Sequence, residues 1–160
     1  MRSRPTTFLA TALAAVLMGG TALLASPATS VASGAATAAP KASGPFRIAR
    51  INYEQGATLN SEYVVVKNVT RHRHVLTGFQ IVDPNDNQRY RFPKTVLRAG
   101  MSVTLHTGHG RNRPHHRYWG QDEPMWNNDG DQAQLRNRSG KVVDRCSYDG
   151  SEGGTTGCSG

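Results

Sequence analysis

The sequence has few cysteines, few aromatic residues and no helical periodicity. Only two of its 160 residues are cysteine, which is too few for a dense disulfide framework, and no Cys-x-x-Cys zinc motif is present. It also has no His-Glu-x-x-His motif, no Ser-His-Asp or Cys-His arrangement and no Gly-rich phosphate loop opening a helix. These absences argue against the common hydrolases and nucleotide-binding folds. We therefore expect that the protein is not an enzyme and that it has no catalytic residues and no cofactor.

The N-terminal segment has the layout of a secretory signal peptide. Arg2 and Arg4 give a positive start, an apolar run spans Phe8 to Leu24, and Ala25, Ser26, Pro27 and Ala28 are small residues suited to cleavage. A membrane anchor is the alternative, but the run is rich in Ala and Gly and no positive cluster follows it. We predict a signal peptide over residues 1–28, with cleavage as late as about residue 32, and hence a secreted protein with no remaining membrane span.

Residues 29–44 are dominated by Ala, Ser, Thr, Gly and Pro and hold one charge, Lys41. Such a stretch cannot bury enough apolar surface to offset its ordering entropy, so it is predicted to be a flexible leader. From Phe46 onward, 16 Lys and Arg oppose 11 Asp and Glu, a net charge of +5. That charge permits attraction to polyanions, although it is equally consistent with ordinary solubility.

Residues 45–149 are predicted to be an all-β domain. The strongest strand signal is Ser61–Asn68, apolar on both faces and without Gly or Pro, which favours a central strand covered on both sides. Further strands are predicted over 46–51, 79–82, 89–92, 101–106, 132–136 and 141–148, with turn signals between them. In the run from Met101 to His106, Met101, Val103 and Leu105 are expected to face inward. About seven short strands at this spacing indicate a β-sandwich or a barrel.

Several segments, in this order, resemble the motifs of one known family. They are Ser61-Glu62-Tyr63-Val64-Val65-Val66-Lys67-Asn68, Leu76-Thr77-Gly78-Phe79-Gln80-Ile81-Val82-Asp83, Tyr90-Arg91-Phe92-Pro93, Leu97-Arg98-Ala99-Gly100-Met101-Ser102-Val103, Tyr118-Trp119-Gly120, Trp126-Asn127-Asn128-Asp129-Gly130-Asp131 and Gly140-Lys141-Val142-Val143-Asp144. Together they are similar to the lamin tail domain in its bacterial secreted form. The resemblance implies an immunoglobulin-like β-sandwich and a non-catalytic binding or structural module. Phe79 departs from the Trp that is common at its position, and the loop from His109 to Arg117 is unusually basic.

The long loop between residues 107 and 131 is the predicted binding site. Its aromatic residues either cover the open end of the core or lie exposed, where they could stack on sugars or bases. Basic residues surround them, which would favour an anionic partner. The candidate ligand-binding residues are Arg111, Arg113, His115, His116, Arg117, Tyr118, Trp119 and Trp126.

Two polar clusters are given structural interpretations. The six histidines, His72, His74, His106, His109, His115 and His116, lack a zinc-ligand spacing, so we expect solvated histidines and no metal. The run containing Asn127, Asn128, Asp129 and Asp131 lacks the spacing of a calcium loop, and we expect a turn whose side chains bond the local backbone.

The last segment, residues 150–160, is a Gly-rich tail. Cys146 and Cys158 form an even pair in a chain predicted to be secreted, so we expect a disulfide that pins this tail. The predicted function is a secreted binding or structural module acting at the cell exterior on an anionic envelope polymer, a nucleic acid or a protein. The alternative is a small metal-assisted nuclease using the histidine- and arginine-rich loop.

Overall fold

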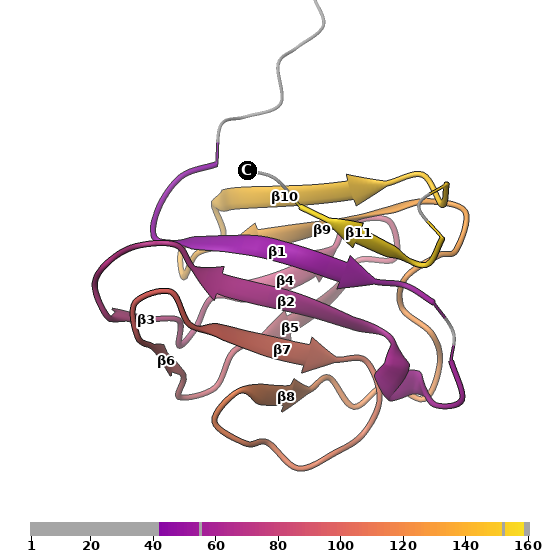
Figure 1. Ribbon diagram of the computed structural model, residues 1–160, viewed down its shortest axis with the longest axis horizontal. Coiled ribbons are helices and arrows are strands. Elements are labelled where there is room, and N and C mark those ends of the chain that lie inside the picture. The colour runs from indigo at the N-terminus through magenta and orange to yellow at the C-terminus, as the bar shows by residue number, and fades with distance from the viewer. Residues whose placement is uncertain (1–41, 55, 152, 159–160) are drawn as a thin grey trace, which may run out of the picture. The chain divides into compact units, whose positions relative to one another are not determined.

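The computed structural model describes residues 42–54, 56–151 and 153–158. The predicted signal peptide and most of the predicted leader lie outside these residues. The described chain is a sandwich of two main β-sheets (Figure 1). No helix in the described ranges is long and apolar enough to cross a membrane.

The first sheet has five strands in the order β11-β1-β2-β7-β8. Its strands are β1 (Phe46–Asn52), β2 (Tyr63–Asn68), β7 (Ser102–His106), β8 (His116–Tyr118) and β11 (Thr155–Gly157). All its pairings are antiparallel except that of β7 with β8. A short 3₁₀ helix, η1 (Leu59–Ser61), precedes β2.

The second sheet has four antiparallel strands in the order β10-β9-β4-β5 and lies behind the first in Figure 1. Its strands are β4 (Gln80–Asp83), β5 (Gln88–Arg91), β9 (Asp131–Arg136) and β10 (Val142–Tyr148). A separate two-stranded ribbon pairs β3 (His74–Val75) with β6 (Val96–Leu97). The strands predicted over 79–82 and 89–92 are confirmed as β4 and β5, which pair with each other as a hairpin.

The core lies between the two sheets and is built from alternate residues of each strand. In β2, Val64 and Val66 are fully buried, whereas Tyr63 and Val65 on the other face are only half-buried. The segment is central, as predicted, but the expectation that both faces are covered is wrong. Its outer face is only half-buried because, within the described residues, no further sheet packs on that side of the five-stranded sheet.

Met101 is a second correction. It was expected to face inward with Val103 and Leu105, but 42% of its surface is exposed. The strand begins only at Ser102, and the Met101 amide closes a turn by donating to the Arg98 carbonyl at 3.1 Å. Strand alternation therefore does not reach Met101.

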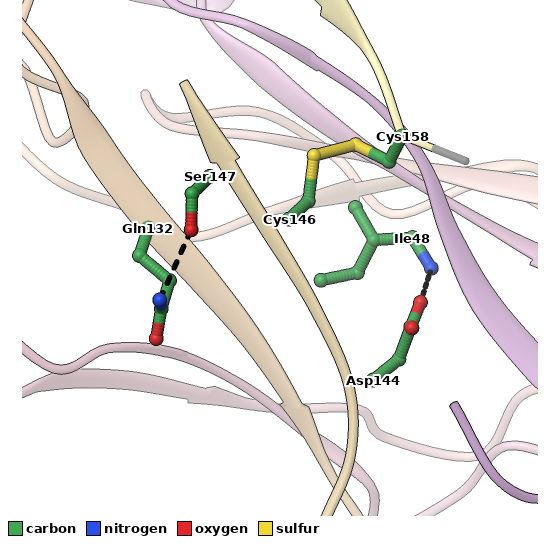
Figure 2. The surroundings of a disulfide bond; sticks show 6 residues. All are labelled: Ile48, Gln132, Asp144, Cys146, Ser147 and Cys158. Atoms are coloured by element: carbon green, nitrogen blue, oxygen red, sulfur yellow. Dashed lines mark hydrogen bonds between the residues drawn. A yellow bond between two sulfur atoms is a disulfide. The ribbon is translucent and has the colours of Figure 1, made fainter. Parts of the chain in front are cut away.

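The C-terminal segment joins the two sheets. β11 pairs with the edge of β1, and the predicted disulfide is confirmed between Cys146 on β10 and Cys158 just after β11 (Figure 2). In the same region, the buried Asp144 carboxylate accepts the Ile48 amide at 2.6 Å. Burial raises the pKa of Asp144, which two backbone amides and Arg47 partly offset. A covalent bond and a hydrogen bond thus connect β10 to the five-stranded sheet.

Candidate functional site

The predicted binding loop is divided between the surface and the interior. Arg111, Arg113, His115 and His116 are exposed, as a binding surface requires. Tyr118 and Trp119 are half-buried, and Arg117 and Trp126 are buried. The eight candidate residues therefore do not form one exposed site.

Trp126 belongs to the hydrophobic core and is 1% exposed. Trp119 packs edge-on against it, with ring centroids 6.3 Å apart, and also contacts Tyr90 at 5.9 Å. The two tryptophans thus cover the end of the core, and the reading in which Trp126 is exposed for stacking is wrong. The reason is that a large apolar ring gains more from burial than from water.

Glu62 holds this part of the loop in place, a role that the sequence analysis missed. It is 2% exposed, and its carboxylate accepts the amides of Met125 at 2.8 Å and Trp126 at 3.1 Å. Burial raises the pKa of Glu62, and the backbone amide of Met125 opposes that rise. The only signal in the sequence is a charged residue directly before an apolar strand.

Arg117 is also buried, so it is not one of the exposed residues that could contact a partner from solvent. Its guanidinium donates through Nη1 to the carbonyls of Arg113 and His116, and through Nη2 to the Thr95 hydroxyl at 2.9 Å. It is buried because Arg117 lies on β8, where alternation turns it away from its exposed neighbour His116. Its side chain ties the loop to the segment before β6.

The exposed His116 on β8 forms a pair with the half-buried His106 on β7. His106 Nε2 and His116 Nδ1 lie 3.0 Å apart, and His106 Nδ1 is 2.9 Å from the Asn60 carbonyl. The pKa of His116 is lowered by desolvation and by the neighbouring positive groups, first among them His106. The pair joins β7 to β8. Across the described parts of the chain, no three His, Cys, Asp or Glu side chains gather to hold a metal ion.

In the predicted turn of residues 127–131, the Asp131 side chain bonds backbone amides at both ends of the turn. The Asp131 carboxylate accepts the Asn127 amide at 3.4 Å and the Gln132 amide at 2.7 Å. Its Oδ1 also accepts the side-chain amide of Asn85 at 2.7 Å. Asn128 and Asp129 are exposed in the same turn. These carboxylate and amide groups serve the backbone at the start of β9.

A different basic surface lies on the outer side of the four-stranded sheet. Strand register places Arg89, Val82, Gln134 and Arg145 in one row across the sheet, and Arg91, Gln80 and Arg136 in the next. Ile81 and Leu135 point the other way into the core, so both rows face outward. We call this surface the arginine face and define it by Gln80, Arg89, Arg91, Gln134, Arg136 and Arg145.

The arginine face carries no acidic side chain. The four strands contain three carboxylates, Asp83, Asp131 and Asp144, and each is at most 6% exposed and lies on the inner side. Among the described residues, none of the four arginines is in an ion pair. Their positive charges are therefore balanced only by solvent ions, which a polyanion can displace.

Side chains along β9 connect part of this face by hydrogen bonds. Arg136 donates to Gln134 Oε1 through Nε at 3.1 Å and Nη2 at 2.7 Å. Gln134 in turn donates to Gln132 at 2.9 Å, and Gln132 donates to Ser147 at 3.0 Å, the last bond drawn in Figure 2. This series, which we call the glutamine ladder, fixes the orientation of the Arg136 guanidinium and leaves its Nη1 without a hydrogen bond to any described residue.

The amino-acid sequence alone did not predict that these four arginines are neighbours. Arg89 and Arg91 are 45 or more residues from Arg136 and Arg145 along the chain. Only the pairing of β4 with both β5 and β9 brings them together. The missing information was the order of strands in the sheet, which alternation does not specify.

Comparison with known proteins identifies one family. The family model described as Lamin Tail Domain matches residues 39–150. No curated protein gives a significant match. The match ends before β11 and Cys158, so the disulfide-linked final strand lies beyond the part that is shared with the family.

Proposed function

The chain belongs to the lamin tail domain family, whose members are immunoglobulin-like binding or structural modules, and we propose that this one is a secreted, non-catalytic module that binds a polyphosphodiester. The proposed site is the arginine face. One observation carries the proposal: four arginines share an outer sheet face that has no carboxylate to neutralise them.

The geometry of the face favours an extended chain over a compact ligand. Neighbouring strands are about 4.8 Å apart, so Arg89 and Arg145, separated by three strand steps, span about 14 Å. The two rows are about 7 Å apart along the strands. A polymer lying across the sheet can therefore meet all four guanidinium groups at once, each of which can donate to two phosphate oxygens.

The face also favours recognition of the polymer backbone. None of its residues is aromatic, and Tyr90 and Phe92, which alternate with its arginines, point to the opposite side of the sheet. Stacking on bases or sugar rings therefore has no platform here. Phosphodiester groups are shared by nucleic acids and by polyol-phosphate polymers of cell envelopes, and they are the chemistry that the face fits.

Location at the cell exterior is part of the proposal. It is supported by the N-terminal pattern of Arg2, Arg4 and the apolar run, and by a disulfide, which persists in oxidising compartments. The nuclease alternative has no support in the described residues, because no group of side chains there is placed to hold the metal that it requires.

The proposal is tested by measuring binding of a fluorescein-labelled 20-unit abasic deoxyribose-phosphate chain across a salt series. We expect the logarithm of the association constant to fall linearly with the logarithm of the salt concentration. Conversion of Arg89, Arg91, Arg136 and Arg145 to Gln should reduce the magnitude of this slope by about 3 and weaken binding at least tenfold. An oligothymidylate of equal length should bind within about twofold of the abasic chain. Binding of poly(glycerol phosphate), measured in the same way, tests whether a polyol-phosphate polymer of the cell envelope can be the ligand.

The matched control removes the same four charges elsewhere. Arg50, Arg71, Arg73 and Arg111 are exposed and lie off the face, so their conversion to Gln should change the slope by less than 1. Equal losses in the two quadruple variants would mean that net charge alone attracts the polymer. Absence of binding by the unmodified protein at low salt would also reject the proposal.

A further inference from the structure

Two adjoining cavities lie beside β8, on a different part of the molecule from the arginine face. One has a volume of about 580 Å³ and the other about 360 Å³, and both are lined by Lys94, Pro114 and Arg117. The larger cavity is completed by Thr95, Val96, Arg98, Met101 and His115, and the smaller by Pro93, Asn112 and Arg113. We call the two together the Arg117 hollow. The combined space is in the range of small-ligand sites.

The lining of the hollow is positive and holds no carboxylate. Lys94, Arg98, Arg113 and His115 are exposed at its edge, and no Asp or Glu is among its lining residues. Arg117 lies beneath them and is 6% exposed. An oxyanion entering the hollow would therefore meet several donors without a competing negative charge.

Arg117 is a buried cation that has no ion-pair partner among the described residues. Its recorded acceptors are backbone carbonyls and the Thr95 hydroxyl, all neutral, and its Nε is buried without a hydrogen-bond partner. A buried charge without an opposite charge is costly, and buried nitrogen donors are nearly always bonded. An anion bound beside Arg117 would lower that cost.

One side of the hollow is apolar. Val96 is 40% exposed and Met101 42%, and both line the larger cavity next to Pro114. Val75, which is 44% exposed, is the cross-strand partner of Val96. Two of the four large apolar side chains that are exposed in the described chain therefore line the hollow, and a third is the cross-strand neighbour of one of them. Such clustering marks a binding surface more often than scattered exposure does.

We infer that the Arg117 hollow binds a small amphipathic anion. Its oxyanion group would lie in the smaller cavity, near Lys94, Arg113 and Arg117, and its apolar part in the larger one, against Val96, Met101 and Pro114. This ligand differs from the polymer proposed for the arginine face, because the hollow is a concave depression with an apolar wall and a buried cation.

The test uses isothermal titration calorimetry with octyl phosphate, kept below its critical micelle concentration. Inorganic phosphate and octanol, which represent its anionic part and its apolar part, are titrated separately. We expect octyl phosphate to bind at least tenfold more tightly than either half. Lys94→Glu should weaken the binding of octyl phosphate at least tenfold. Met101→Ser should weaken the binding of octyl phosphate about fivefold and leave the binding of inorganic phosphate unchanged.

Two controls separate this inference from its alternatives. Lys141→Glu makes the same charge change at an exposed turn outside the hollow and should have little effect. The variant with four glutamines on the arginine face should still bind octyl phosphate, so the two proposed sites can fail independently. Equal binding of octanol and octyl phosphate, an equal loss in Lys141→Glu, or no binding at all would overturn the inference.

Discussion

The arginine face and the long loop of residues 107–130 use basic residues in opposite ways. In the loop, arginines are close in sequence, yet Arg117 turns inward to bond carbonyls while Arg113 stays in solvent. On the face, Arg89 and Arg145 are far apart in sequence, yet strand register places them in one row. The comparison teaches that a basic surface is made by strand pairing, and that a run of basic residues in a loop is not by itself a surface.

The largest expected effect is a loss of stability when the buried part of the long loop is changed. Trp126→Ala should lower the free energy of unfolding by about 3–5 kcal/mol, because it leaves a cavity in the core and removes the ring on which Trp119 packs. Arg113→Ala, at an exposed site of the same loop, should cost less than about 0.5 kcal/mol. Urea unfolding followed by circular dichroism measures both. Similar costs for the two would show that the loop is not divided as described.

Asp83 and Asp131 lie where the two regions meet, since Asp131 ends the loop and begins β9. Burial raises the pKa of Asp83, and the Asp131 charge raises it further; its Oδ2 is buried without a partner. An acid with a raised pKa favours the folded state most at low pH, and that contribution is lost as pH rises above about 4 through the folded pKa.

Asp83→Asn should therefore stabilise the protein at pH 7 by about 1 kcal/mol, or roughly 4 °C in Tm. Asn keeps the Oδ1 that accepts the Asn85 and Asp86 amides and removes the charge. The gain should shrink as pH falls toward 4. Thermal melts at pH 4 to 7 measure it, and Asp86→Asn, at an exposed site of the same turn, is the control. A gain that is constant with pH would contradict the ionisation argument.

The sequence predicted the fold better than the site. The seven predicted strands are all present because each is long enough for an apolar run or an alternation to appear, as where arginine and aromatic residues alternate from Arg89 to Phe92. The strands that it missed, β3, β6, β8 and β11, have two or three residues. No periodicity can be recognised over that length, and such strands form only because a partner is already in place.

The candidate site depended on information that local patterns do not contain. The buried Trp126 is held by Glu62, 64 residues earlier, whose carboxylate accepts its amide. The buried Arg117 guanidinium is bonded to Thr95, which comes from another strand connection. Composition suggested an anionic partner, but the side chains that are free to meet one were determined by these long-range contacts.

The smallest expected effect tests whether orientation matters on the arginine face. Gln134→Ala breaks the glutamine ladder and releases the Arg136 guanidinium without removing its charge. Binding of the abasic phosphate chain should weaken about two- to threefold with an unchanged salt slope, whereas Arg136→Gln should lower the slope by about 0.7. Gln121→Ala, in the long loop, is the control. A fall in slope for Gln134→Ala would mean that the ladder determines how many arginines reach the phosphates, and no loss of affinity would mean that charge alone is sufficient.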